Sequence, residues 1–142
     1  MASTVTKQVV TNNNRDYVVN VQILQSNTAV ETATVLLDMS DLALTIPSGA
    51  SAASDVAVTK FVVEKIEWNV LGMESDELLF DATTNVPIHF MTGQGEVDWT
   101  AQGGITDPFG SGATGDILFT TNGGTMVVTD RANFTLFLRK KA

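Results

Sequence analysis

The amino-acid sequence predicts an all-β protein, an antiparallel β-sandwich of jelly-roll type with about eight or nine strands. Short stretches of alternating apolar and polar residues recur along the chain, and clusters of Gly, Asn, Asp and Ser separate them. No segment has the length and periodicity of a full helix, so a parallel βαβ sheet is not expected. The chain has 142 residues, the length of one ordinary domain, and we expect a single sandwich domain over residues 1–142.

The alternation predicts strands at 4–10, 17–25, 30–38, 61–71, 77–81, 86–91, 96–100, 116–121 and 125–129, followed by a last strand in which Phe134, Leu136 and Leu138 point inward. The inward face of 17–25 is expected to carry Tyr17, Val19, Val21 and Ile23. Residues 30–38 are expected to pair back onto 17–25. In 61–71 the expected apolar face carries Val62, Ile66, Trp68 and Val70, and Glu64 interrupts this face.

Turn and loop residues mark the connections between these strands. Pro87 has no N–H for a sheet ladder, which predicts an edge strand or a bulge at 86–91. Residues 39–44 suggest one helical turn, and the Asn122-Gly123-Gly124 stretch suggests a hairpin turn. The segments 45–55 and 101–115 are rich in small residues and are predicted to be surface loops that can reach a neighbouring molecule.

Composition excludes several classes of function. The formal net charge is −8 and the basic residues are scattered, so the chain lacks the basic stripe that a nucleic-acid binder needs. No apolar run approaches the roughly 20 residues that span a bilayer, and no membrane partner is expected. Without cysteine, disulfides and thiolate zinc sites are impossible.

No catalytic, cofactor-binding or metal-binding residues are predicted. The only histidine, His89, lies in a short strand without a serine nucleophile elbow nearby, so a packing or surface role is expected. Residues 110–115 match the dinucleotide fingerprint G-x-G-x-x-G, but Ile117, Leu118 and Phe119 continue as a strand, whereas the fingerprint requires a helix there. Nucleotide binding is therefore not expected.

Acidic residues gather between positions 64 and 98, and three interpretations stay open. The group includes Glu64, Glu74, Asp76, Glu77, Asp81 and Glu96, with Lys65 as the opposing charge. It could be a solvated acidic surface, a contact for a basic partner or a set of calcium ligands, although the spacing fits no known calcium loop. Trp68 is expected in the core, whereas a solvent-facing Trp99 or Tyr17 could form the platform of a carbohydrate-binding module.

Five segments together resemble a family of small virion proteins of tailed bacteriophages. The segments are 31–38 (ETATVLLD), 66–69 (IEWN), 78–83 (LLFDAT), 115–121 (GDILFTT) and 135–141 (TLFLRKK). Each is strand and turn sequence without a catalytic motif. The resemblance therefore implies a virion location and a non-enzymatic role like that of capsid decoration or cement proteins, which bind the outer shell and reinforce it.

In that role the partners would be the major capsid protein or other virion proteins, and a homo-oligomer is expected. The candidate assembly contacts lie on the two loops and the C-terminal tail; they are Pro47, Ser48, Gly49, Ser51, Asp107, Pro108, Phe109, Arg139, Lys140 and Lys141. Two alternatives stay open. One is a tail, neck or fibre component of the virion, and the other is a carbohydrate-binding β-sandwich module.

Overall fold

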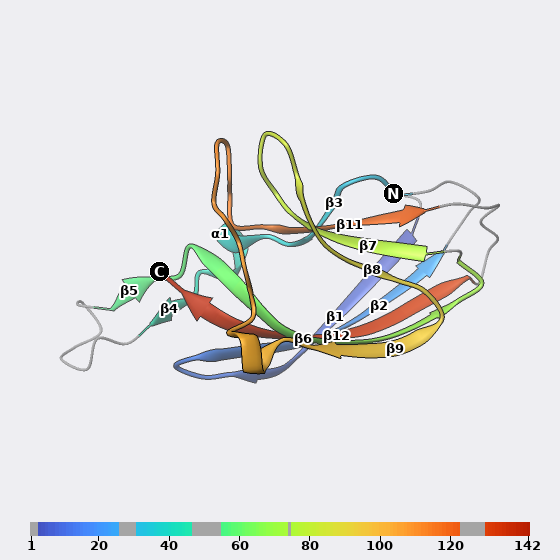
Figure 1. The fold of residues 1–142 in the computed structure, drawn as a ribbon, viewed down its shortest axis with the longest axis horizontal. Coiled ribbons are helices and arrows are strands. Elements are labelled where there is room, and N and C mark those ends of the chain that lie inside the picture. Colours follow the sequence, from blue (N-terminus) through green and yellow to red (C-terminus); the bar gives the residue numbers. More distant parts are fainter. Residues whose placement is uncertain (1–2, 26–30, 47–54, 74, 123–129) are drawn as a thin grey trace.

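The computed structural model describes residues 3–25, 31–46, 55–73, 75–122 and 130–142, and within them two antiparallel sheets share one core (Figure 1). This confirms the predicted all-β sandwich. The strands are β1 (Ser3–Asn12), β2 (Asp16–Gln25), β3 (Thr34–Leu37), β4 (Thr45–Ile46), β5 (Val56–Ala57), β6 (Lys60–Leu71), β7 (Ser75–Phe80), β8 (Val86–Met91), β9 (Gln94–Asp98), β10 (Ile105–Thr106), β11 (Ile117–Asn122) and β12 (Arg131–Lys141). One helical turn, α1 (Met39–Leu42), and a 3₁₀ turn (Thr100–Gln102) complete the described elements.

Sheet A has the order β1-β2-β12-β6, and β9 and β10 both pair with the outer edge of β6. Sheet B has the order β3-β11-β7-β8, and β4 pairs with β5 in a small arm that projects beside the C-terminus (Figure 1). Nine strands of the described chain have four residues or more, in line with the eight or nine expected. The other three, β4, β5 and β10, have two residues each. Jelly-roll connectivity stays a prediction.

The core forms where the two central strands of sheet A present alternating apolar residues to sheet B. Tyr17, Val19, Val21 and Ile23 of β2 are all buried, and so are Phe134, Leu136 and Leu138 of β12. Both sets agree with the predicted inward faces. Burying one such side chain contributes about 1.5–3 kcal/mol, so these two strands supply a large part of the folding free energy.

The segment 31–38 joins the other sheet, so its predicted pairing with 17–25 is wrong. Only Thr34–Leu37 forms a strand, β3, and it pairs with β11. The backbone N–H of Glu31 donates to Thr121 Oγ1 (2.8 Å) and that of Ala33 to Thr120 Oγ1 (2.8 Å), which attaches the segment to β11. Ala33 has φ 47°, a left-handed turn that precedes the short strand.

A bulge in β6 changes which residues face the core, so the predicted face of 61–71 is only partly right. Lys65 pairs with Phe137 and Val63 with Leu138, which leaves Glu64 as the extra residue. After the bulge Ile66, Trp68 and Val70 contact the core as expected, but before it Phe61 and Val63 do so. Val62, which was expected on that face, is instead buried on the opposite one.

The predictions for Pro87 and for residues 39–44 are confirmed, and Asn13 closes a further turn. β8 is the edge strand of sheet B, with a register shift beside Pro87, as the missing N–H requires. The Asn13 side chain accepts from the backbone N–H groups of Arg15 (2.9 Å) and Asp16 (2.7 Å) and closes the β1–β2 turn. Asp38 caps α1 by accepting from Ser40 N (3.0 Å). The expected strand 125–129 and the glycines of its turn lie outside the described residues.

Gly115 is required where the loop that precedes β11 passes over residue 59. It has φ +84°, and a Cβ at this position would lie 2.0 Å from the backbone oxygen of Thr59. Gly110, in the same loop, has open space around it and no left-handed φ. The two glycines therefore differ in both backbone strain and available room.

We expect Gly115→Ala to lower the free energy of unfolding by at least about 2 kcal/mol, because the new methyl group strains the backbone and meets a carbonyl that cannot rotate away. Thermal unfolding should show a Tm at least about 5 °C lower. Gly110→Ala is the matched control and should leave the Tm unchanged. Equal Tm values for the two variants would contradict this account of the loop.

Candidate functional site

His89 packs between two tryptophan rings at the edge of the sandwich. Its ring centroid lies 5.2 Å from that of Trp68 and 5.4 Å from that of Trp99, with the second contact edge-to-face. Burial lowers the pKa of His89 below its ordinary value, because desolvation disfavours the charged ring. These contacts give the histidine a packing role, the role expected from the sequence.

The glycine-rich fingerprint of 110–115 forms a turn that leads into β11, as expected from the strand that follows it. Gly112, with φ +74°, lies so close to Thr83 that a Cβ would overlap its hydroxyl. Gly112 and Gly115 of this segment thus permit close packing, whereas Gly110 has open space around it. Among the residues described, no group of three or more His, Asp or Glu side chains is arranged to hold a metal ion.

The acidic residues expected to cluster are distributed over separate environments. Glu64, on the bulge, accepts from Arg15 Nη1 (3.3 Å) and Nη2 (3.0 Å), and Arg139 Nη1 lies 3.7 Å away. Glu96 pairs with Lys65 (3.6 Å). Asp81 accepts from Thr114 Oγ1 (2.6 Å), and Glu74 lies outside the described residues.

Asp76 has the least favourable surroundings of these carboxyl groups. It is 0% exposed on the inward face of β7, and neither of its oxygens has a hydrogen-bond partner among the described residues. Its register neighbours on that face are Thr121 and Met91. Burial alone raises the pKa of Asp76 to about 7, because desolvation penalises the charged form.

The candidate assembly contacts fall into three groups in the structure. Pro47, Ser48, Gly49 and Ser51 lie outside the described residues. Asp107 and Lys140 are buried: Asp107 Oδ1 accepts from Phe109 N (2.8 Å), and Lys140 Nζ donates to Asn12 Oδ1 (2.6 Å) and to the backbone oxygen of Asn13. Asp107 therefore stabilises the loop at 101–115, and Lys140 stabilises the β1–β2 turn. Pro108, Phe109 and Lys141 are exposed, and Arg139 is half-buried beside Glu64.

The exposed Phe109 lies at the end of the sandwich that carries the β4–β5 arm, because it lines one hollow with Thr45 of β4 and Ala57 of β5. The C-terminus lies beside the same arm (Figure 1). A hollow of about 500 Å³ opens there; its lining is Met39, Ser40, Ala43, Leu44, Thr45, Ala57, Val58, Thr59, Phe109 and Thr114. Thr59 N donates to Lys141 O (3.0 Å), which ties the C-terminal strand to the same place. We call this region, with Lys60 and Lys141, the contact end. Its aromatic residue, Phe109, is 39% exposed and has φ 51°.

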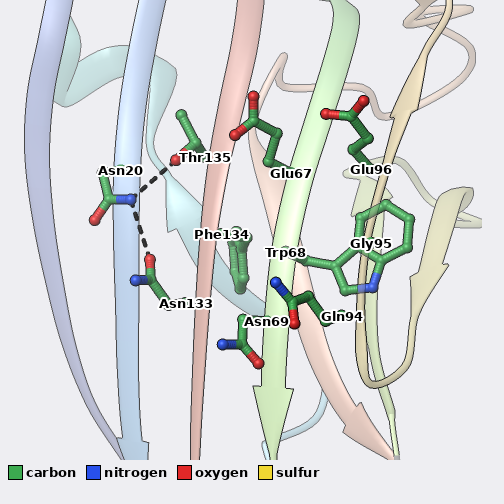
Figure 2. A pocket seen from close by; sticks show the side chains of 10 residues that line it. All are labelled: Asn20, Glu67, Trp68, Asn69, Gln94, Gly95, Glu96, Asn133, Phe134 and Thr135. Atoms are coloured by element: carbon green, nitrogen blue, oxygen red, sulfur yellow. Dashed lines mark hydrogen bonds between the residues drawn. The ribbon is translucent and has the colours of Figure 1, made fainter.

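A second hollow, of about 430 Å³, lies over sheet A and was not expected from the sequence. Figure 2 shows residues from β2, β12, β6 and β9 around it; they are Asn20, Glu67, Trp68, Asn69, Gln94, Gly95, Glu96, Asn133, Phe134 and Thr135. Asn20 Nδ2 donates to Asn133 Oδ1 (3.0 Å) and Thr135 Oγ1 (2.9 Å). Finding this hollow from sequence requires the strand register, because its residues come from four separated segments.

The two aromatic side chains considered as a platform for carbohydrate binding differ in their exposure to solvent. Tyr17 is 3% exposed and stacks on Phe61, with ring centroids 5.7 Å apart. Trp99 is half-buried against His89. Tyr17 is thus unavailable to solvent, and Trp99 offers only part of its ring.

No family model matches the chain, and no curated protein matches it. No helix in the described part of the chain is long and apolar enough to cross a membrane.

Asp76 predicts a specific dependence of stability on pH. Its folded-state pKa of about 7 lies above the ordinary 3.8, so the folded state holds the proton more tightly. The stability that this proton gives is complete below about pH 4 and is lost as the pH rises through about 7, with a total of at most about 4 kcal/mol.

We expect Asp76→Asn to remove this loss, because the amide stays neutral at every pH. Urea unfolding of both proteins at pH 5 and pH 8 should show a variant that gains stability relative to wild type as the pH rises. A difference between the two proteins that stays constant from pH 5 to pH 8 would show that Asp76 is not protonated in the folded state.

Proposed function

We propose that the protein is a non-enzymatic structural component of a bacteriophage virion, most specifically a decoration or cement protein that binds the outer capsid shell. The resemblance of five strand segments to small phage virion proteins motivates this proposal. The observation that carries it is Phe109, an exposed aromatic side chain held in a strained backbone conformation at the rim of an apolar hollow.

The backbone of Phe109 makes its exposure informative. A bulky residue with φ 51° costs about 1–3 kcal/mol, and such strain is found mainly at functional positions. The backbone N–H of Phe109 donates a hydrogen bond to Asp107 Oδ1, which stabilises the turn. Lys60 Nζ lies 5.3 Å from the centroid of the Phe109 ring. The fold thus leaves part of an apolar ring exposed at the rim of the hollow, as in the aromatic anchors of protein interfaces.

The contact end also has the composition of a protein interface. Six of the ten residues that line its hollow are apolar, and two lysines beside it, Lys60 and Lys141, are register partners. An apolar centre with a charged rim is typical of surfaces that bury against a partner. Binding there to the assembled shell and not to free subunits would stabilise the shell by mass action.

Copy number tests the virion location directly. If the protein decorates the shell, purified particles should contain hundreds of copies, because the shell repeats its binding sites by symmetry. Quantitative mass spectrometry against the major capsid protein measures this ratio. About a dozen copies would instead favour the tail, neck or fibre alternative, and absence from particles would overturn the proposal.

Truncation of the exposed ring tests the contact end. We expect Phe109→Ala to weaken binding to undecorated particles at least tenfold, since interface anchors of this kind contribute about 2 kcal/mol or more. Phe90→Ala is the matched control, because Phe90 is also exposed, at 57%, but lies on β8 outside the contact end. Both variants should keep the wild-type Tm. Equal binding by the two variants would exclude Phe109 as an anchor.

A further inference from the structure

The outer face of sheet A carries two rows of polar side chains that run across four strands. Strand register places Asn20, Thr135, Glu67 and Glu96 side by side in one row, which we call the carboxylate row. The next row, two residues along each strand, contains Gln22, Asn133, Asn69 and Gln94, and we call it the amide row. With strands about 4.8 Å apart, each row spans about 14 Å.

Seven of the eight residues in the two rows, all but Gln22, line the 430 Å³ hollow together with Trp68, Gly95 and Phe134 (Figure 2). A hollow of this size is within the range of small-ligand sites, about 300–1,000 Å³. Gly95, between Gln94 and Glu96 on β9, lies against the Trp68 ring, where a Cβ would come within 2.8 Å of it. β9 pairs with β6 along this stretch, and the polar side chains of both strands therefore border one hollow.

The amides of the hollow have hydrogen-bonding capacity that the described chain leaves unused. Asn20 engages Asn133 and Thr135 through its Nδ2 atom, which leaves its own Oδ1 and the Nδ2 of Asn133 available. No side-chain hydrogen bond to another described residue engages Asn69 or Gln94. Each free amide offers both a donor and an acceptor, which is the pattern that a hydroxyl group matches.

The charges around the hollow select against ionic ligands. No lysine, arginine or histidine lines it, whereas Glu67 and Glu96 do, so phosphate, sulfate and carboxylate groups would be repelled. Lys65 Nζ already lies 3.2 Å from Glu67 and 3.6 Å from Glu96, so a cationic ligand would have to compete with it. A neutral ligand rich in hydroxyl groups meets neither obstacle.

We propose that this hollow binds a neutral oligosaccharide, with its sugar rings laid across β2, β12, β6 and β9. The distance between neighbouring strands is comparable with the length of one pyranose ring, so successive rings would meet successive members of the two rows. Carboxylate oxygens of Glu67 and Glu96 accept from sugar hydroxyls, and the amides both accept and donate. This inference does not depend on the proposed virion role.

Titration followed by NMR tests the site. The probes are chitotetraose and maltotetraose, which are neutral, with tetragalacturonate and tetralysine as charged ligands of comparable length. We expect at least one neutral probe to shift the side-chain amide signals of Asn69, Gln94 and Asn133, with a Kd of about 1 mM or tighter. The Kd should change less than about twofold when salt is raised, because no ion pair forms.

Variants separate this site from other surfaces. The Asn69→Ala/Gln94→Ala double variant should bind the neutral probe at least tenfold more weakly, since it loses hydrogen bonds from two amides. Gln102→Ala is the matched control, an exposed amide on the 3₁₀ turn, and should bind like wild type. Both variants should keep the wild-type Tm, because the replaced side chains are exposed.

Three results would overturn the proposal. The first is the absence of any shift with either neutral probe, and the second is preferential binding of tetragalacturonate or tetralysine. The third is a neutral probe that shifts the Trp99 indole signal while the amides of the hollow stay unchanged, since the sugar would then bind at the sandwich edge.

Discussion

The placement of β12 between β2 and β6 is the constraint on which the rest of the structure depends. The C-terminal strand contributes Phe134, Leu136 and Leu138 to the core and pairs along its whole length with β6. The extra residue at Glu64 shifts this pairing by one, and a shift of one residue exchanges the two faces of a strand. Without it, either the half of β6 before the bulge or the half after it would turn its apolar residues to the outer face.

The ion pairs of Glu64 show how the bulge is accommodated. A buried carboxylate without partners is unfavourable, but Arg15 reaches it from the β1–β2 turn and Arg139 from β12. Lys140, next to Arg139, bonds back to the same turn through Asn12. The basic tail was expected from the sequence to contact a partner. Arg139 and Lys140 instead make contacts within the molecule, and Lys141 is exposed beside the arm.

Sequence alternation was sufficient to predict the inward faces of the central strands of sheet A. In β2 and β12 every second residue is apolar, so the inward face is evident without the partner strand. It was insufficient for 31–38, where Leu36 and Leu37 are both buried and alternation is lost, and for β6, where one glutamate marks a bulge. The two polar rows were beyond prediction, because each row joins residues up to 115 positions apart through register alone.

The two candidate surfaces occupy different parts of the sandwich, and this bears on how they can act together. The contact end lies where the β4–β5 arm and the C-terminus meet, whereas the polar rows lie across the middle of sheet A (Figure 1). If the protein docks through Phe109 as proposed, the face of sheet A would stay in solvent. Substitutions at one surface are therefore expected to leave the other intact, because the residues of one surface do not line the other.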